Sequence, residues 1–216
     1  MSDVKEIIAR RAARELHDGD IVNLGIGLPT LVTDYLDSDI EVILQSENGI
    51  LGMKGAAEPH EVNPDVTNAG GSHVTVHSFA SFFDSATSFG FIRGGHVDVT
   101  ILGALQVDKD GSLASHIVPG KMVPGMGGAM DLVAGAKNVI VVMTHTAKGD
   151  APKILEKCTL PLTAYKKVNR IITELAVIDV TQNGLVLKEI NKDTTVDNVV
   201  KLTQAKLIIP DKIETF

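Results

Sequence analysis

Apolar residues form two patterns along this chain: positions that recur at helical intervals, and short continuous runs typical of buried strands. Within residues 4–17 the apolar positions recur at helical intervals, which predicts an amphipathic helix that ends at the turn 18–20. Short, mostly apolar runs predict strands at 21–24, 40–44, 97–102 and 138–143. Strands of this kind that alternate with helices are typical of a largely parallel sheet.

Glycine and proline mark where further helices begin. A glycine loop precedes Pro29, which suits a first helical position, so we expect a helix over 29–36. The apolar stretch 79–92 is predicted to be largely helical, and a short helix is expected to begin near Ala129.

The C-terminal third has the pattern of a hairpin followed by a helix. Strands predicted at 171–180 and 185–190 flank a Gln-Asn-Gly turn, and a helix is expected over 194–202, with Thr194 as its cap. The whole pattern predicts one α/β domain over 1–216, with a mostly parallel sheet flanked by helices and a C-terminal hairpin.

One stretch, residues 53–72, departs from this regularity. It is rich in glycine, proline, asparagine and acidic residues, and it has little periodicity. A loop of this length within a compact chain is usually functional or mobile.

Composition excludes several classes of function. The 216 residues are 44% apolar and 22% charged, as in an ordinary globular domain, and the net charge of −7 argues against nonspecific binding to nucleic acid. No apolar run approaches the roughly 20 residues of a membrane helix, and no signal peptide is evident at the N-terminus. Cys158 is the single cysteine, so no intrachain disulfide is possible. We therefore expect a cytoplasmic protein that binds neither nucleic acid nor membrane.

The first glycine-rich loop, 23–30, lies between a predicted strand and a predicted helix. Its Gly25 and Gly27 could present backbone N–H groups to an anion. Glu47 follows Gly27 by 20 residues, as the ribose-binding acid of a dinucleotide fold would. Against that interpretation, Thr30 stands where a third glycine belongs, and a turn follows the acid instead of a helix.

Two later loops complete the candidate chemistry. Glu47 lies at the end of a predicted strand before Asn48, either as an accessible carboxylate nucleophile or as a solvated turn residue. Gly127 and Gly128 precede the short helix near 129, where consecutive N–H groups could form an oxyanion hole or could simply allow close packing.

Five segments occur in one order along most of the chain: NLGIGLPT at 23–30, QSENG at 45–49, FIRGGHVDVTILGALQVD at 91–108, PGKMVPGMGGAMDL at 119–132 and KCTLPLT at 157–163. Through them the chain, from about Lys5 to Leu207, closely resembles the B subunits of the two-subunit, short-chain acyl CoA transferases of family I. These include the acetate/butyrate–acetoacetate and succinyl–3-oxoacid enzymes. The resemblance implies a fold of the NagB/RpiA/CoA transferase type.

The resemblance also implies roles for individual residues. In that family the glutamate of the SENG segment is the nucleophile, so Glu47 takes that role, and Gly128 is assigned the oxyanion donor. Gly25, Gly27, Asn48 and Gly127 are further candidates for the oxyanion or coenzyme A site. The implied reaction is ping-pong transfer through a glutamyl-CoA thioester, without a metal and with coenzyme A thioesters as substrates. The implied partner is a homologous A subunit in an A2B2 heterotetramer.

Three residues and one loop bear on acyl specificity and on coenzyme A binding. His116 stands where relatives often carry tryptophan, and together with the loop 53–72 it leaves acyl specificity undecided. Arg93 and Lys121 could pair with coenzyme A phosphates or could be ordinary surface cations. Acetoacetyl-CoA with acetate or butyrate is the first expectation for the substrates, and succinyl-CoA with acetoacetate is the alternative.

Other functions need separate tests. A hydrolase of the same fold would use water as acceptor, and a noncatalytic ligand-binding subunit would not need Glu47. His73 and His77 lack an evident third ligand for zinc, and the chain has no Gly-x-Ser-x-Gly element of a serine hydrolase. Cys158 has no histidine nearby in sequence and is expected to be a small buried residue.

Overall fold

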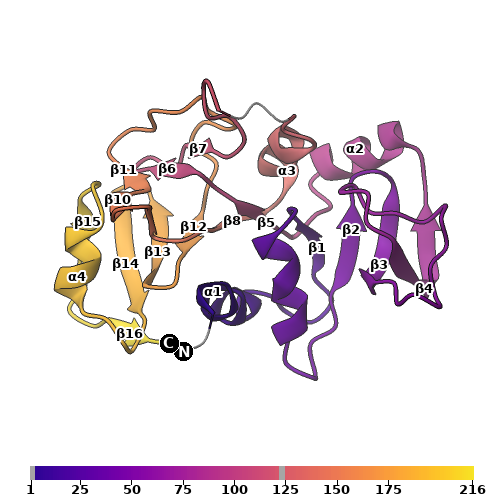
Figure 1. Cartoon of the computed structure of the whole chain (residues 1–216), viewed down its shortest axis with the longest axis horizontal. Helices are drawn as coiled ribbons and strands as arrows, with labels where there is room; N and C mark the ends of the chain where they lie inside the picture. The colour runs from indigo at the N-terminus through magenta and orange to yellow at the C-terminus, as the bar shows by residue number, and fades with distance from the viewer. Residues whose placement is uncertain (1–2, 122–124) are drawn as a thin grey trace.

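A sheet of eleven strands runs across the molecule in the computed structural model, which describes residues 3–121 and 125–216 (Figure 1). Its strand order is β15-β14-β13-β12-β8-β5-β1-β2-β3-β4, with β16 beside β14. The five central strands are parallel: β2 (Ile43–Ser46), β1 (Ile21–Leu24), β5 (Val99–Gly103), β8 (Asn138–Val142) and β12 (Arg170–Ile172). The prediction of a parallel sheet is thus confirmed at its centre.

Antiparallel strands extend both sides of this centre. They are β3 (Ile50–Ala56) and β4 (Val74–Phe82) beyond β2, and β13 (Ala176–Thr181) and β14 (Gly184–Ile190) beyond β12. Short strands β15 (Leu207–Ile208) and β16 (Glu214–Thr215) run parallel to β14. The predicted C-terminal hairpin is β13–β14. Two small sheets lie outside: β6 (Gln106–Asp108), β7 (Leu113–Ala114) and β11 (Ile154–Leu155) form one, and β9 (Thr146–Ala147) and β10 (Ala151–Pro152) form the other.

Helices cover both faces of the sheet and produce two hydrophobic cores. In β8, Val139 and Val141 lie in one core, whereas Ile140 and Val142 lie in the other, because successive strand residues point to opposite faces. The first core includes residues of α2 (Ser85–Arg93), α3 (Ala129–Gly135) and α4 (Val196–Lys201). The second includes α1 (Val4–Ala13) and the 3₁₀ helix η1 (Leu28–Tyr35). Burial on both faces explains why the central strands are apolar runs.

Two predicted elements were wrong in type or extent. The stretch 79–92 is not one helix, because β4 continues through Phe82 and α2 begins only at Ser85. The carboxylate of Asp84 caps α2 by accepting the N–H of Thr87 at 2.7 Å, which fixes the change of structure at this point. The predicted strand 171–180 is two strands separated by a turn.

The turn that divides this strand is stabilised by a side chain. The hydroxyl of Thr173 accepts the N–H groups of Leu175 and Ala176, so the chain reverses between β12 and β13. Smaller differences concern helix ends and helix type: α1 ends at Ala13, residues 28–35 form a 3₁₀ helix, and Thr195 instead of Thr194 caps α4.

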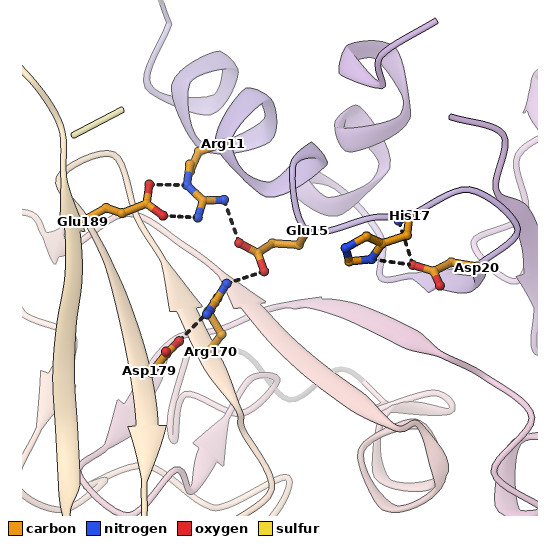
Figure 2. A network of polar contacts seen from close by, with 7 residues as sticks. All are labelled: Arg11, Glu15, His17, Asp20, Arg170, Asp179 and Glu189. Carbon is orange, nitrogen blue, oxygen red and sulfur yellow. Dashed lines mark hydrogen bonds and ion pairs between the residues drawn. The ribbon is translucent and has the colours of Figure 1, made fainter. Parts of the chain in front are cut away.

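A partly buried ion network joins α1 to the C-terminal half of the sheet (Figure 2). Arg11 of α1 is only 5% exposed and donates to Glu189 of β14 at 2.7 Å and to Glu15 at 2.7 Å. Glu15 in turn pairs with Arg170 of β12, whose Nε donates to Asp179 of β13 at 2.6 Å. The N-terminal helix is therefore tied to three consecutive strands of the C-terminal half by one chain of charges, all of them partnered.

We expect Arg11→Met to destabilise the protein strongly. The substitution leaves the partly buried Glu189 without its partner and leaves Glu15 paired with Arg170 alone, at a cost of about 3 kcal/mol in the free energy of unfolding. Arg10→Met is the matched control, since Arg10 is exposed and pairs with Glu6 on the helix surface, worth at most about 1 kcal/mol. Urea denaturation followed by circular dichroism measures both, and equal midpoints would contradict the account.

Candidate active site

Glu47 lies in the tight connection between β2 and β3, directly after the carboxyl end of β2. Ser46 and Ile50 are paired across the two strands, and the N–H of Gly49 donates to the carbonyl of Ser46 at 2.9 Å. The Glu47 side chain is half-buried, whereas its neighbour Asn48 is exposed. A carboxylate in this position is reachable from solvent yet partly desolvated, which is what a nucleophile requires.

Gly49 holds this connection in place through a close backbone approach. Its φ is +118°, and a Cβ at this position would lie 1.9 Å from the carbonyl oxygen of Phe83. The N–H of Phe83 also donates to the Gly49 carbonyl at 3.0 Å. The residue that follows β4 therefore fixes the turn that carries Glu47, and only glycine fits there.

The long loop lies against the same turn. Its first residues belong to β3, and the remainder contacts the turn through two hydrogen bonds. The Asn48 side chain donates to the carbonyl of Thr67 at 2.7 Å, and the hydroxyl of Ser46 accepts the N–H of Ala69 at 3.0 Å. The stretch 53–72 is therefore tied to the turn that carries Glu47.

The glycines near residue 128 lie directly against the Glu47 side chain. A Cβ on Gly128 would be 3.1 Å from Cγ and 3.3 Å from Oε1 of Glu47, and one on Gly127 would be 3.8 Å from Oε1. The structure thus brings together the second and third glycine-rich loops, which are far apart in sequence. The third loop reaches Glu47 at the start of α3. Residues 122–124 of the third loop lie outside the described residues.

Two buried amides connect Glu47 to the interior. The side-chain nitrogen of Asn23 in β1 donates to Oε1 of Gln45 in β2 at 2.7 Å and lies 3.4 Å from Oε2 of Glu47. Gln45 donates in turn to the hydroxyl of Ser88 in α2 at 3.0 Å. Asn23 and Gln45 are each 1% exposed. Sequence reasoning did not single them out, although polar residues within apolar strands were the available signal.

Gly25 and Gly27 follow the carboxyl end of β1, as Glu47 follows the carboxyl end of β2. The N–H of Gly25 donates to the carbonyl of Ile101 at 2.8 Å, and a Cβ there would come within 3.3 Å of that oxygen, so this glycine allows close packing on β5. Gly27 has a φ of +88° and directly precedes η1. Their assignment to ligand binding stays a prediction.

The remaining candidates lie in ordinary structural surroundings. Arg93 pairs with Asp131 at 2.7 Å and joins α2 to α3. His116 is buried, and its Nδ1 lies 2.9 Å from the hydroxyl of Thr163. Lys121 is exposed beside the segment that is not described. Burial, with a smaller effect of Asp108, raises the pKa of Cys158 to about 12, which opposes a reactive thiolate.

Two further observations on the described residues concern metal-ligating clusters and membrane-spanning helices. Residues 3–121 and 125–216 contain no cluster of three or more metal-ligating side chains, and His77 stacks on Phe79 with ring centroids 4.8 Å apart. Among the same residues, no helix has the length and apolar character needed to cross a bilayer.

Comparison with known proteins shows what the chain is similar to. The Coenzyme A transferase family model matches residues 5–202. The chain is 55% identical to the acetate CoA-transferase subunit beta of Haemophilus influenzae over 209 residues, covering 97% of this chain and 93% of that protein. It is 50% identical over 203 residues to human mitochondrial succinyl-CoA:3-ketoacid coenzyme A transferase 2, covering 93% of this chain but 39% of that protein.

A solved structure shares the fold. The apoenzyme of an acyl-CoA transferase from Escherichia coli O157:H7 matches with a TM-score of 0.79 at 23% identity, over 99% of this chain and 43% of that one.

We expect Gly49→Ala to destabilise the fold around Glu47. The added Cβ meets the Phe83 carbonyl and the positive φ disfavours alanine, so the unfolding free energy should fall by about 2 kcal/mol or more. Gly55→Ala in the neighbouring part of β3 is the control, since its Cβ has nothing within 4 Å. Urea denaturation of both variants tests this, and equal stability of the two would contradict the steric account.

Proposed function

This chain belongs to the coenzyme A transferase family, and we propose that it is the B subunit that carries the covalent nucleophile, Glu47. The observation that carries the proposal is the setting of one carboxylate. It is half-buried, lies 3.4 Å from the Asn23 amide nitrogen, and lies so close to Gly127 and Gly128 that a Cβ on either would be within 4 Å of it. Such a group can attack a carbonyl carbon while donors nearby stabilise the charge that develops.

The proposed reaction transfers coenzyme A from an acyl-CoA to a free carboxylate in balanced steps. An oxygen of Glu47 attacks the thioester carbonyl, the carbon–sulfur bond breaks, and the coenzyme A thiolate leaves a mixed anhydride. The thiolate then attacks the glutamyl carbonyl and releases the first carboxylate, which gives a glutamyl-CoA thioester. The incoming carboxylate reverses both steps. Splitting the transfer in this way predicts ping-pong kinetics.

Each of these steps passes through an oxyanion, so backbone N–H donors near the carboxylate matter. We assign this role to Gly128, because its backbone lies against Glu47 at the start of α3, where the first N–H groups of a helix lack helical partners. One such donor typically contributes about 10²–10³ in rate. Gly25, Gly27, Asn48 and Gly127 stay secondary candidates for the oxyanion and coenzyme A sites.

The substrates are proposed first from the family, and the particular acyl groups are then proposed from similarity to individual relatives. Coenzyme A thioesters are the substrates of the family, and we propose acetoacetyl-CoA with acetate or butyrate as donor and acceptor. The succinyl-CoA:3-ketoacid enzyme among the relatives keeps succinyl-CoA with acetoacetate as the alternative. A hydrolase of the same fold would release coenzyme A when no acceptor acid is present, which a transferase should not do.

The assembly is proposed from the relatives. The Haemophilus influenzae relative is named subunit beta, which implies a partner subunit, and the match to the human relative covers only 39% of that protein. We therefore propose a homologous A subunit, in an A2B2 complex located in the cytoplasm. The continuous central sheet supports treating this chain as one domain.

We expect Glu47→Ala to reduce CoA transfer by about 10³-fold or more in the complex with the A subunit, because the nucleophile is removed. Glu41→Ala is the control, since Glu41 is an exposed acid just before β2, and its variant should keep normal activity. Initial rates with acetoacetyl-CoA and acetate measure both. Full activity of Glu47→Ala would favour a noncatalytic binding subunit instead.

We expect Gly128→Ala to lower kcat by roughly tenfold, because the new methyl group would lie 3.1 Å from Cγ of Glu47 and would shift the carboxylate, although the backbone N–H is kept. Gly125→Ala belongs to the same loop, yet its Cβ has nothing within 4 Å, so its activity should stay near normal. Steady-state kinetics on both complexes make the comparison. An equal loss in the two variants would show that loop flexibility, and not contact with Glu47, is what matters.

A further inference from the structure

A row of polar residues crosses three parallel strands beneath Glu47. In the register of the sheet, Asn23 of β1 is paired with Gln45 of β2 on one side and with Thr100 of β5 on the other. Side chains paired in this way point to the same face of a sheet, here the face where Gln45 contacts Ser88 of α2. Thr100 is fully buried, as are Asn23 and Gln45 to within 1%.

The acceptors around Asn23 determine how its amide is oriented. Its Nδ2 faces three oxygens: the carbonyl of Gln45 at 3.1 Å, Oε1 of Gln45 at 2.7 Å and Oε2 of Glu47 at 3.4 Å. The donor end of the amide must therefore lie on this side. Its oxygen, Oδ1, then lies at the other end of the amide, where it accepts no hydrogen bond from a described residue.

Two buried atoms lack hydrogen-bond partners among the described residues, and they belong to neighbouring members of this row. They are Oδ1 of Asn23 and the hydroxyl oxygen of Thr100. One is an acceptor and the other carries a donor proton, on side chains whose backbones are directly paired. Buried polar atoms are almost always satisfied, either directly or by an ordered water, so these two atoms complement each other.

We propose that Thr100 is a positioning residue for the nucleophile. Its hydroxyl donates to Oδ1 of Asn23, directly after a small rotation or through one buried water, and thereby holds the Asn23 amide with its nitrogen toward Glu47. The row then has one direction of donation, from Thr100 to Asn23 and from Asn23 to Gln45 and Glu47. This inference rests on the proposed role of Glu47 and adds a residue that does not touch it.

A purely structural Thr100 predicts the opposite response to substitution. If its hydroxyl has no partner in the protein, valine has the same shape without a buried orphan group, so Thr100→Val should leave activity intact. Serine would then be the poorer substitute, because it loses the methyl group from a packed core. The pair Thr100→Val and Thr100→Ser therefore separates the hydroxyl from the methyl group.

The test is steady-state kinetics of both variants in the complex with the A subunit, with acetoacetyl-CoA and acetate. We expect Thr100→Val to lower kcat by about five- to tenfold with KM changed less than about twofold, and Thr100→Ser to keep kcat within about twofold of normal. Urea denaturation of the complex checks that the valine variant is folded. Normal kcat in Thr100→Val, or an equal loss in Thr100→Ser, would overturn the proposal.

A high-resolution crystal structure of the unmodified complex provides a second test that does not depend on activity. We expect a direct contact between the Thr100 hydroxyl and Oδ1 of Asn23, or a single water bonded to both, and the absence of both arrangements would overturn the inference. The proposed function is tested separately by Glu47→Ala. Loss of activity there, with normal activity in Thr100→Val, would refute only the role of Thr100.

Discussion

The hydrogen bonds of the Asn23 amide are the interaction on which the site depends. Asn23 and Gln45 are buried in two neighbouring parallel strands, and a buried amide must find its partners within the protein. The nitrogen of Asn23 satisfies this requirement by donating to Gln45, and it reaches the carboxylate of Glu47 at the end of the same strand. A requirement of the interior therefore places an amide donor 3.4 Å from the Glu47 carboxylate, just beyond the carboxyl end of β2.

Other constraints act on Glu47 from the remaining sides. Gly49 is held under the carbonyl of Phe83, Gly128 lies against the carboxylate, and the long loop is bonded to Ser46 and Asn48. At the other half of the sheet, the ion network through Arg11 fixes α1 to β12, β13 and β14. The frame is thus stabilised by burial and charge pairing, whereas the site uses close backbone contacts that only glycine permits.

The sequence predicted the parts of this structure that depend on local patterns. Apolar runs located the central parallel strands, and the Gln-Asn-Gly turn located the β13–β14 hairpin. The stretch 79–82 was misassigned because a short apolar run has no periodicity that separates a buried strand from a helix. The break at Thr173 depends on a single hydroxyl that satisfies two backbone groups, which no apolar pattern reveals.

The candidate site was predictable in its loops but not in its support. Glu47 and Gly128 were predicted through the family resemblance, and in the structure a Cβ on Gly128 would lie 3.1 Å from Cγ of Glu47. Asn23, Gln45 and Thr100 were missed because their contacts depend on strand register, a tertiary property that sequence separation hides.

The most direct test of the account is to trap the covalent intermediate. The complex would be incubated with acetoacetyl-CoA, treated with borohydride, which reduces a glutamyl thioester to an alcohol, and analysed by mass spectrometry with peptide mapping. The account predicts that Glu47 loses one oxygen and gains two hydrogens. An unchanged Glu47 in a complex that still transfers coenzyme A would contradict it.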